Sequence, residues 1–208
     1  MRSRGFGQRA PKSGNTDPDR LAVTGGSDGG YLTLMAGTFE TPPKALVSFY
    51  GNADLVGKWY SEPDPFYCKQ PMVTEEDPRR HSSGPPVSNS SEREDRAPFY
   101  LSCRQQGIWP IGVGGVDPKD DPDFFVPYCP DQNVSPTYPP TLLLHGTNDT
   151  GVHYDLSVRM AAALEAGDIE HELITIAKVG NGFDGNAGDP DQIDAAWERV
   201  YVFLDEHV

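Results

Sequence analysis

A short loop near the start of the sequence carries a candidate nucleophile. Residues 25–29 read "GGSDG", which places Ser27 in a G-x-S-x-G pattern between the strand-like run "LAVTGG" and a helix-like run. Glycines at both ends allow a tight turn that projects the serine hydroxyl beyond the strand. The backbone N–H of Asp28 is then placed to donate to a developing oxyanion. The pattern predicts a nucleophile elbow, with a plain glycine-rich turn as the alternative.

Two later loops hold the other candidate residues. In "HGTNDTGV", residues 145–152, Asp149 comes just after the apolar run "LLLHG". A carboxylate there suits the acid that orients a catalytic base, although such a residue also serves as a turn or N-cap residue. In "GNGFDG", residues 180–185, Asn181 follows another strand-like run. A serine, then an acid, then a third residue is the chain order of α/β-hydrolases.

Strand-like and helix-like segments alternate along the chain and place these loops together. Short apolar or alternating runs predict strands, whereas apolar residues spaced by three or four predict helices. Strands alternating with helices indicate a parallel sheet, whose strands end at a common edge where ligands bind. We expect strands at 21–26, 45–51, 141–146 and 171–176, and helices beginning near Ser27 and over 98–107, 154–166 and 190–207.

Residues 52–138 differ from the rest of the chain, because Pro, Gly, Ser and charged residues dominate them. A structureless loop of this length is improbable in a compact domain. The aromatic patches within it predict a cap, called here the cap segment, with one polar loop. Its aromatic residues form either the lining of an apolar pocket or the core of the cap: Trp59, Tyr60, Phe66, Tyr67 and Trp109. Residues 17–208 then make one domain, and residues 1–16 are predicted to be disordered.

Composition excludes several classes of partner. The formal net charge of -14 disfavours nucleic acids and anionic lipids, since no basic field attracts phosphate. The sequence has no apolar run long enough to span a membrane and no signal peptide, so a cytoplasmic location is the default. Three cysteines without metal-ligand spacing predict free thiols and no metal site, with one disulfide among them as the alternative.

Three motifs in this order resemble the α/β-hydrolase superfamily: "DPDRLAVTGGSDGGYLTLMAG", "YPPTLLLHGTNDTGV" and "HELITIAKVGNGFDG". The resemblance covers residues 17–208 and is greatest to the esterase and prolyl-oligopeptidase-like (S9-type) branch. It implies a partial α/β-hydrolase fold with a cap insertion and with the family's N-terminal strands and "HGG" oxyanion loop missing. The first strand would then be an exposed sheet edge, and we expect either that a partner or self-association covers it or that the chain is a fragment of a longer protein.

The resemblance implies hydrolysis of an ester or a peptide bond through an acyl-enzyme on Ser27, with Asp149 as the acid and no cofactor. The family has histidine where this chain has Asn181, and an amide cannot accept a proton at physiological pH. Among the five histidines, His153 is the candidate to replace the base or to contact substrate, because it lies near Asp149 at the active edge. The second hypothesis is a non-catalytic pseudo-hydrolase or a truncated fragment.

Overall fold

The computed structural model describes residues 17, 19–74, 97–185 and 188–208. The segment 1–16 that we predict to be disordered lies outside the described residues, as do His81 and the polar centre of the cap segment. Within the described residues, no helix is long and apolar enough to cross a membrane.

Four parallel strands form one sheet in the order β1-β2-β3-β4. Ala22 pairs with Ala45, Leu46 with Thr141, and Thr141 with His171, so each strand lies beside its neighbour in the sequence. The parallel sheet predicted from the alternating pattern is therefore confirmed. The strands are β1 (Ala22–Gly26), β2 (Ala45–Phe49), β3 (Thr141–Gly146) and β4 (His171–Ile176).

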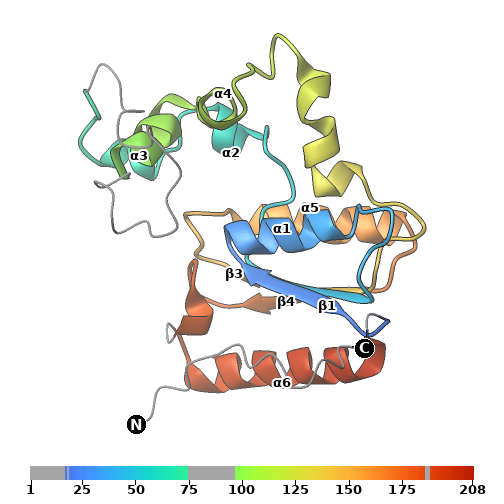
Figure 1. The fold of residues 1–208 in the computed structure, drawn as a ribbon. Coiled ribbons are helices and arrows are strands. Elements are labelled where there is room, and N and C mark those ends of the chain that lie inside the picture. The colour runs from blue at the N-terminus through green and yellow to red at the C-terminus, as the bar shows by residue number, and fades with distance from the viewer. Residues whose placement is uncertain (1–16, 18, 75–96, 186–187) are drawn as a thin grey trace.

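Helices cover both faces of this sheet. Figure 1 shows α1 (Asp28–Ala36) and α5 (Tyr154–Ala166) on one face and α6 (Pro190–His207) on the other. Successive strand residues point to opposite faces. Leu143 therefore packs with Met160 of α5, whereas Leu142 and Leu144 of the same strand pack with the α6 side. Two apolar layers result, and they fix the sheet between its helices.

The first strand is less buried than its apolar sequence predicts. None of the β1 residues is fully buried, and Thr24 and Gly26 are exposed. Within the described residues β1 pairs with β2 alone, so it lies at the edge of the sheet. An edge strand leaves backbone groups without partners. The partner that we expect to cover this edge stays a prediction.

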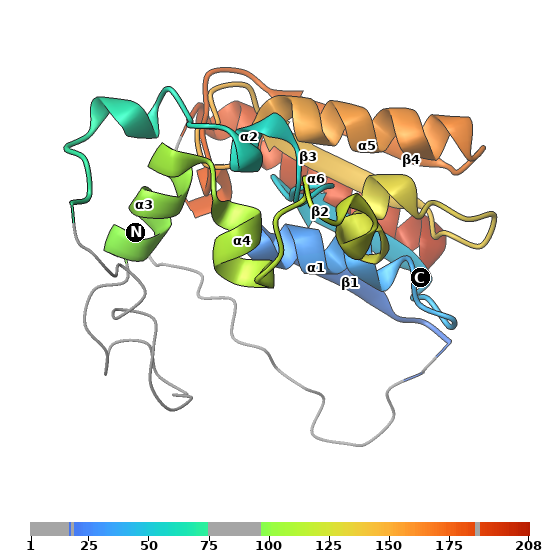
Figure 2. The ribbon, with the colours of Figure 1, turned by 90° about the horizontal axis from the view of Figure 1, so that it is seen from above.

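The cap segment contains short helices above the carboxyl ends of the strands. Figures 1 and 2 show α2 (Lys58–Ser61), α3 (Ala97–Gln106) and α4 (Trp109–Gly114) grouped beyond that end of the sheet. The helix predicted over 98–107 is confirmed as α3. Short 3₁₀ helices complete the connections: η1 (Tyr67–Lys69), η4 (Pro122–Tyr128), η5 (Pro130–Gln132) and η6 (Phe183–Gly185).

Candidate active site

Ser27 lies in a strained turn between β1 and α1. Its φ of 56° and ψ of -121° are unfavourable for a residue with a side chain. The Ser27 N–H donates to the Phe49 carbonyl at 3.0 Å, and its own carbonyl accepts from Tyr31 in α1. A β-carbon at Gly25 would overlap the backbone of Gly29, so the turn requires glycine at that position. This backbone fits the strand-to-helix turn of a nucleophile elbow.

Asp28 opens α1 with an exposed side chain. An acidic residue in the first turn of a helix interacts favourably with the backbone N–H groups there. Its charge is also among the causes that raise the pKa of Tyr60, although burial of that phenol is the largest cause. Tyr60 of the cap segment therefore lies near the turn that carries Ser27.

Asp149 is buried in the turn after β3, with only 7% of the residue exposed. One carboxylate oxygen, Oδ1, accepts from the backbone N–H groups of Gly151 and Val152 at 2.8 and 2.9 Å. We call residues 149–153 the acid turn. The other oxygen, Oδ2, faces the loop after β4. This arrangement leaves one oxygen for a partner from that loop.

Asn181 is that partner. Its side-chain amide Nδ2 donates to Asp149 Oδ2 at 2.9 Å. The loop 180–185 thus brings residue 181 to the acid, as the motif order predicts. The roles of Ser27 and Asp149 in catalysis stay predictions. Within the described residues, the hydrogen bonds of Ser27 are those of its backbone.

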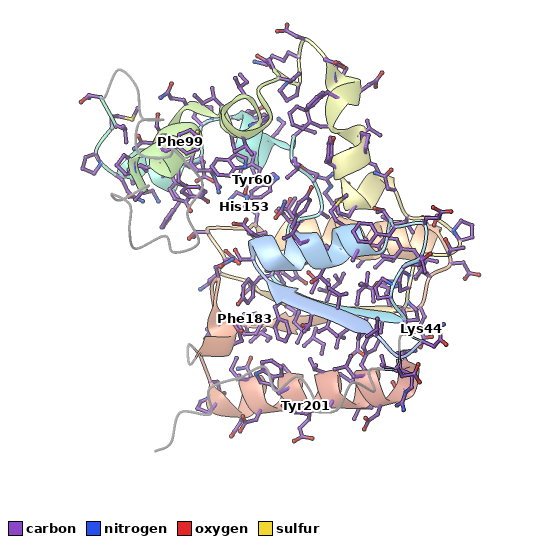
Figure 3. The ribbon with its side chains drawn as sticks, in the orientation of Figure 1. Lys44, Tyr60, Phe99, His153, Phe183 and Tyr201 are labelled. Atoms are coloured by element: carbon purple, nitrogen blue, oxygen red, sulfur yellow. The ribbon has the colours of Figure 1, made fainter. Side chains whose placement is uncertain are left out.

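Two histidines approach the acid turn, and the proposal that His153 replaces the base stays a prediction. His145 is fully buried, and its Nδ1 and Nε2 lie 2.7 Å from Ser157 Oγ and 2.9 Å from the Val152 carbonyl. His145 Nε2 also lies 3.4 Å from Asp149 Oδ2, a proximity that sequence reasoning missed. His153 Nε2 lies 3.2 Å from Asp64 of the cap segment. Figure 3 shows His153 beside Tyr60 below the cap helices.

The aromatic residues of the cap segment fall into two groups. Trp59 and Tyr60 are buried and stacked on each other, with ring centroids 3.4 Å apart. Tyr60 stacks in turn on Trp109, which is half-buried. Phe66 is largely exposed, and Tyr67 packs against Tyr100. Trp109 also lines an apolar cavity of about 220 Å³ together with Leu55, Pro110, Val113, Phe124, Phe125 and Tyr128.

Sequence reasoning missed a hydrogen bond that holds the 180–185 loop. The Tyr50 hydroxyl donates to Asp184 Oδ1 in that loop. Burial first, and then the Asp184 contact, raise the pKa of Tyr50, so the phenol stays a donor.

Tyr50 itself has a φ of 40°, just after β2 ends at Phe49. The strand expected over 45–51 is shorter for this reason.

The structure resolves the alternatives for the cysteines. Cys68, Cys103 and Cys129 form no disulfide within the described residues, so the disulfide left as an alternative is absent there. Burial raises the pKa of Cys129 to about 11, which keeps it a thiol. The described ranges contain no cluster of three His, Cys, Asp or Glu side chains that could hold a metal ion.

Comparison with known proteins identifies the family. The profile of the prolyl oligopeptidase family matches residues 8–101 and 111–208. A comparison with curated protein sequences finds no match.

Solved structures share the fold at low identity. An acylaminoacyl peptidase of Pyrococcus horikoshii superposes with a TM-score of 0.62 at 20% identity, covering 91% of this chain and 24% of its own. A puromycin-hydrolyzing peptidase of Mycobacterium tuberculosis gives 0.58 at 24% identity, over 92% of this chain and 22% of its own. A Staphylococcus aureus protein of unknown function gives 0.67 at 19% identity, over 89% and 64%. This chain thus spans about a quarter of the length of the two peptidases.

Proposed function

This chain belongs to the prolyl oligopeptidase family, and we propose from that premise that it is built to cleave an ester or peptide bond through an acyl-enzyme on Ser27. The observation that carries the proposal is the hydrogen bond of 2.9 Å between Asn181 and Asp149. It supports a pairing of residue 181 with the acid, which is the pairing that a catalytic base requires.

The chemistry assigns a role to each group. The Ser27 oxygen attacks the carbonyl carbon of the substrate, a base takes the hydroxyl proton, and the same proton passes to the leaving group. The Asp28 N–H donates to the oxyanion formed in that step. Water then attacks the acyl-enzyme and frees Ser27. Asn181 cannot take the proton, so we propose that this chain is a strongly impaired hydrolase.

The side-chain nitrogen of Asn181 has the same place in its side chain as Nδ1 has in histidine. This nitrogen is bonded to Cγ, as Nδ1 of histidine is, and it already donates to Asp149 Oδ2. An imidazole at this position would donate from Nδ1 to the same oxygen and direct Nε2 away from the acid. The substitution Asn181→His therefore adds a base without removing the contact to Asp149.

The test is turnover of p-nitrophenyl acetate by Asn181→His. Because general base catalysis contributes about 10²–10⁴-fold, we expect a gain of at least about 10²-fold over the native chain. Ser27→Ala in the same background should abolish the gain. Asn148→His is the matched control, because Asn148 is exposed in the neighbouring loop and lacks the contact to Asp149. No gain in Asn181→His, and no labelling of Ser27 by a fluorophosphonate, would contradict the proposal.

We propose that the apolar cavity beside Trp109 takes the apolar part of the substrate. Tyr60 stacks on Trp109 of the cavity wall, and burial first, with the charge of Asp28 among the further causes, raises the pKa of Tyr60. Longer acyl esters should then be preferred by Asn181→His over acetate, and Trp109→Ala should remove that preference. Phe66→Ala is the control, since Phe66 is 43% exposed and lies outside this cavity lining.

The second candidate function is a pseudo-hydrolase that binds a ligand or a protein without turnover. The Asn181 amide favours it, because it satisfies Asp149 Oδ2 without supplying a base. Ser27-dependent turnover in the native chain, absent from Ser27→Ala, would exclude this function. A comparison of turnover in the native chain and in Ser27→Ala thus separates the two candidates.

A further inference from the structure

A buried arginine of the cap segment also contacts residues outside the cap. Arg104 of α3 has no exposed surface, yet an arginine keeps its charge in a protein. Its guanidinium donates to Asp64 Oδ2 at 2.6 Å and to the Tyr100 hydroxyl at 2.7 Å. Four aromatic rings surround it, with centroids 4.5–5.6 Å from its Cζ atom: Trp59, Tyr60, Tyr67 and Tyr100. This cage fixes the position of the guanidinium within the cap.

The third contact of Arg104 leaves the cap and ends on the acid turn. Its Nη1 donates to the Gly151 carbonyl at 2.9 Å. That carbonyl belongs to the same peptide group as the Val152 N–H, which donates to Asp149 Oδ1 at 2.9 Å. A donor on the carbonyl polarises the peptide and strengthens the bond that its N–H makes. Arg104 is thus connected to the Asp149 carboxylate through one peptide group.

A second contact joins the cap to the other end of the acid turn. Asp64 Oδ2, which accepts from Arg104, also lies 3.2 Å from His153 Nε2. Burial by itself would raise the pKa of Asp64, but hydrogen bonds from Arg104 and from the backbone of Phe66 and Tyr67 lower it below its ordinary value. Asp64 is therefore an anion at neutral pH. The Arg104–Asp64 pair contacts residues 151 and 153 from one side.

We propose that Arg104 is a positioning residue, which holds the acid turn so that Asp149 Oδ2 faces residue 181. A buried ion pair often contributes less to stability than apolar residues of the same size would. An apolar side chain could fill the cage, but it could not hold the Gly151 carbonyl. The catalytic meaning of this position rests on the proposed function, whereas the contact itself does not.

Amide hydrogen exchange measured by NMR on the native chain and on Arg104→Met tests the proposal. We expect Val152 to exchange at least about tenfold faster in Arg104→Met, with a smaller effect at Gly151, while amides within β3 and β4 keep their rates. Arg159→Met is the matched control, because Arg159 bonds Asp54 and Asp131 and none of the acid turn. Unchanged exchange at Val152 in Arg104→Met would overturn the proposal.

Two further variants keep the test decisive if Arg104→Met fails to fold. Arg104→Lys keeps the charge but loses the planar fork that reaches Asp64 and Gly151 together, so it should show the same selective effect at Val152. Asp64→Asn removes the charge that fixes Arg104 and should raise exchange at Val152 less than Arg104→Lys does. If both variants exchange as the native chain does, Arg104 has no positioning role.

An activity measurement separates this inference from the proposed function. In the Asn181→His background, Arg104→Lys should lower kcat more than it raises KM, because it disturbs the base and its acid rather than substrate contacts. If Asn181→His has no Ser27-dependent turnover, the proposed function fails while the exchange result still decides the positioning role. If turnover is present and kcat is unaffected by Arg104→Lys, the positioning role fails alone.

Discussion

At the scale of single residues, the turn around Ser27 depends on how closely two backbones approach. Gly30 lies in the first turn of α1, where a β-carbon would be 2.7 Å from the Phe49 carbonyl and 2.8 Å from the Gly51 Cα. Gly29 precedes it, and a β-carbon there would meet nothing within 4 Å. Of these two adjacent glycines, Gly30 has no room for a β-carbon, whereas Gly29 has room for one.

We expect Gly30→Ala to lower the free energy of unfolding by about 2 kcal/mol, because the backbone must shift to admit the methyl group. Gly29→Ala should instead raise it by about 0.5 kcal/mol, since alanine restricts the unfolded chain. Urea denaturation of the two variants measures both effects. Equal effects in the two variants would contradict the close packing of α1 on β2.

The sequence located the loops of the candidate site better than the residues that support them. Ser27, Asp149 and Asn181 follow short motifs whose spacing sets their place after a strand, so their loops could be found. Arg104 and Asp64 lie in a segment without periodicity, and their partners are distant in the sequence. Nothing in a local pattern indicates that an arginine of α3 will contact Gly151. Such supports depend on how the cap packs, which only the folded structure defines.

At the scale of elements, α6 covers one face of the sheet, and α1 and α5 cover the opposite face. Its buried residues include Val200 and Phe203, and both pack with strand residues such as Leu142 and Leu144. The amphipathic spacing of Trp197 and Val200 predicted this helix over 190–207, and the observed bounds are Pro190–His207. A long periodic pattern is the most dependable sequence signal.

Truncation of Phe203 tests how much this helix contributes. Phe203 is 2% exposed, so Phe203→Ala should lower the free energy of unfolding by about 3–5 kcal/mol. The neighbouring Val202 is 47% exposed, so Val202→Ala should change it by less than about 0.5 kcal/mol. Thermal and urea denaturation provide the measurement. A small loss in Phe203→Ala would show that α6 is only loosely packed on the sheet.

Two short helices of the cap, α2 and α4, were missed for a local reason. The helix α4 has six residues, with proline at its second position and glycine at its last. Such a helix is too short to show a 3.6-residue period, and η4 and η5 are 3₁₀ helices, which do not follow that period. The aromatic patches predicted that rings of this segment pack together, and Trp59 and Tyr60 are indeed buried. They could not indicate which rings stack together.

At the scale of the whole molecule, the cap is joined to the rest of the domain partly by charge. The pKa of Asp64 is below its ordinary value of 3.8, so ionised Asp64 stabilises the folded state. This stabilisation is complete above the unfolded pKa and is lost as the pH falls through the lower, folded pKa. Acid should therefore weaken the cap first on the side of Asp64, Arg104 and His153.

The pH dependence of unfolding measures this effect. Between about pH 5 and pH 2, the urea midpoint of the native chain should fall more steeply than that of Asp64→Asn. Asp205→Asn, at an exposed position of α6, is the control and should follow the native curve. Parallel curves for the native chain and Asp64→Asn would show that the Arg104 contact does not depend on the charge of Asp64.

The strand order has a consequence for how the molecule folds. One helix connects β1 to β2, and one helix connects β3 to β4. Leu46 of β2, by contrast, must pair with Thr141 of β3 across the entire cap segment. Contacts between distant residues form slowly, because a long loop must close before they stabilise the chain. We therefore expect two local units, on either side of the cap segment, to form early and to join late. Ser27 belongs to the first unit and Asp149 to the second, so the candidate site forms only when the two units join.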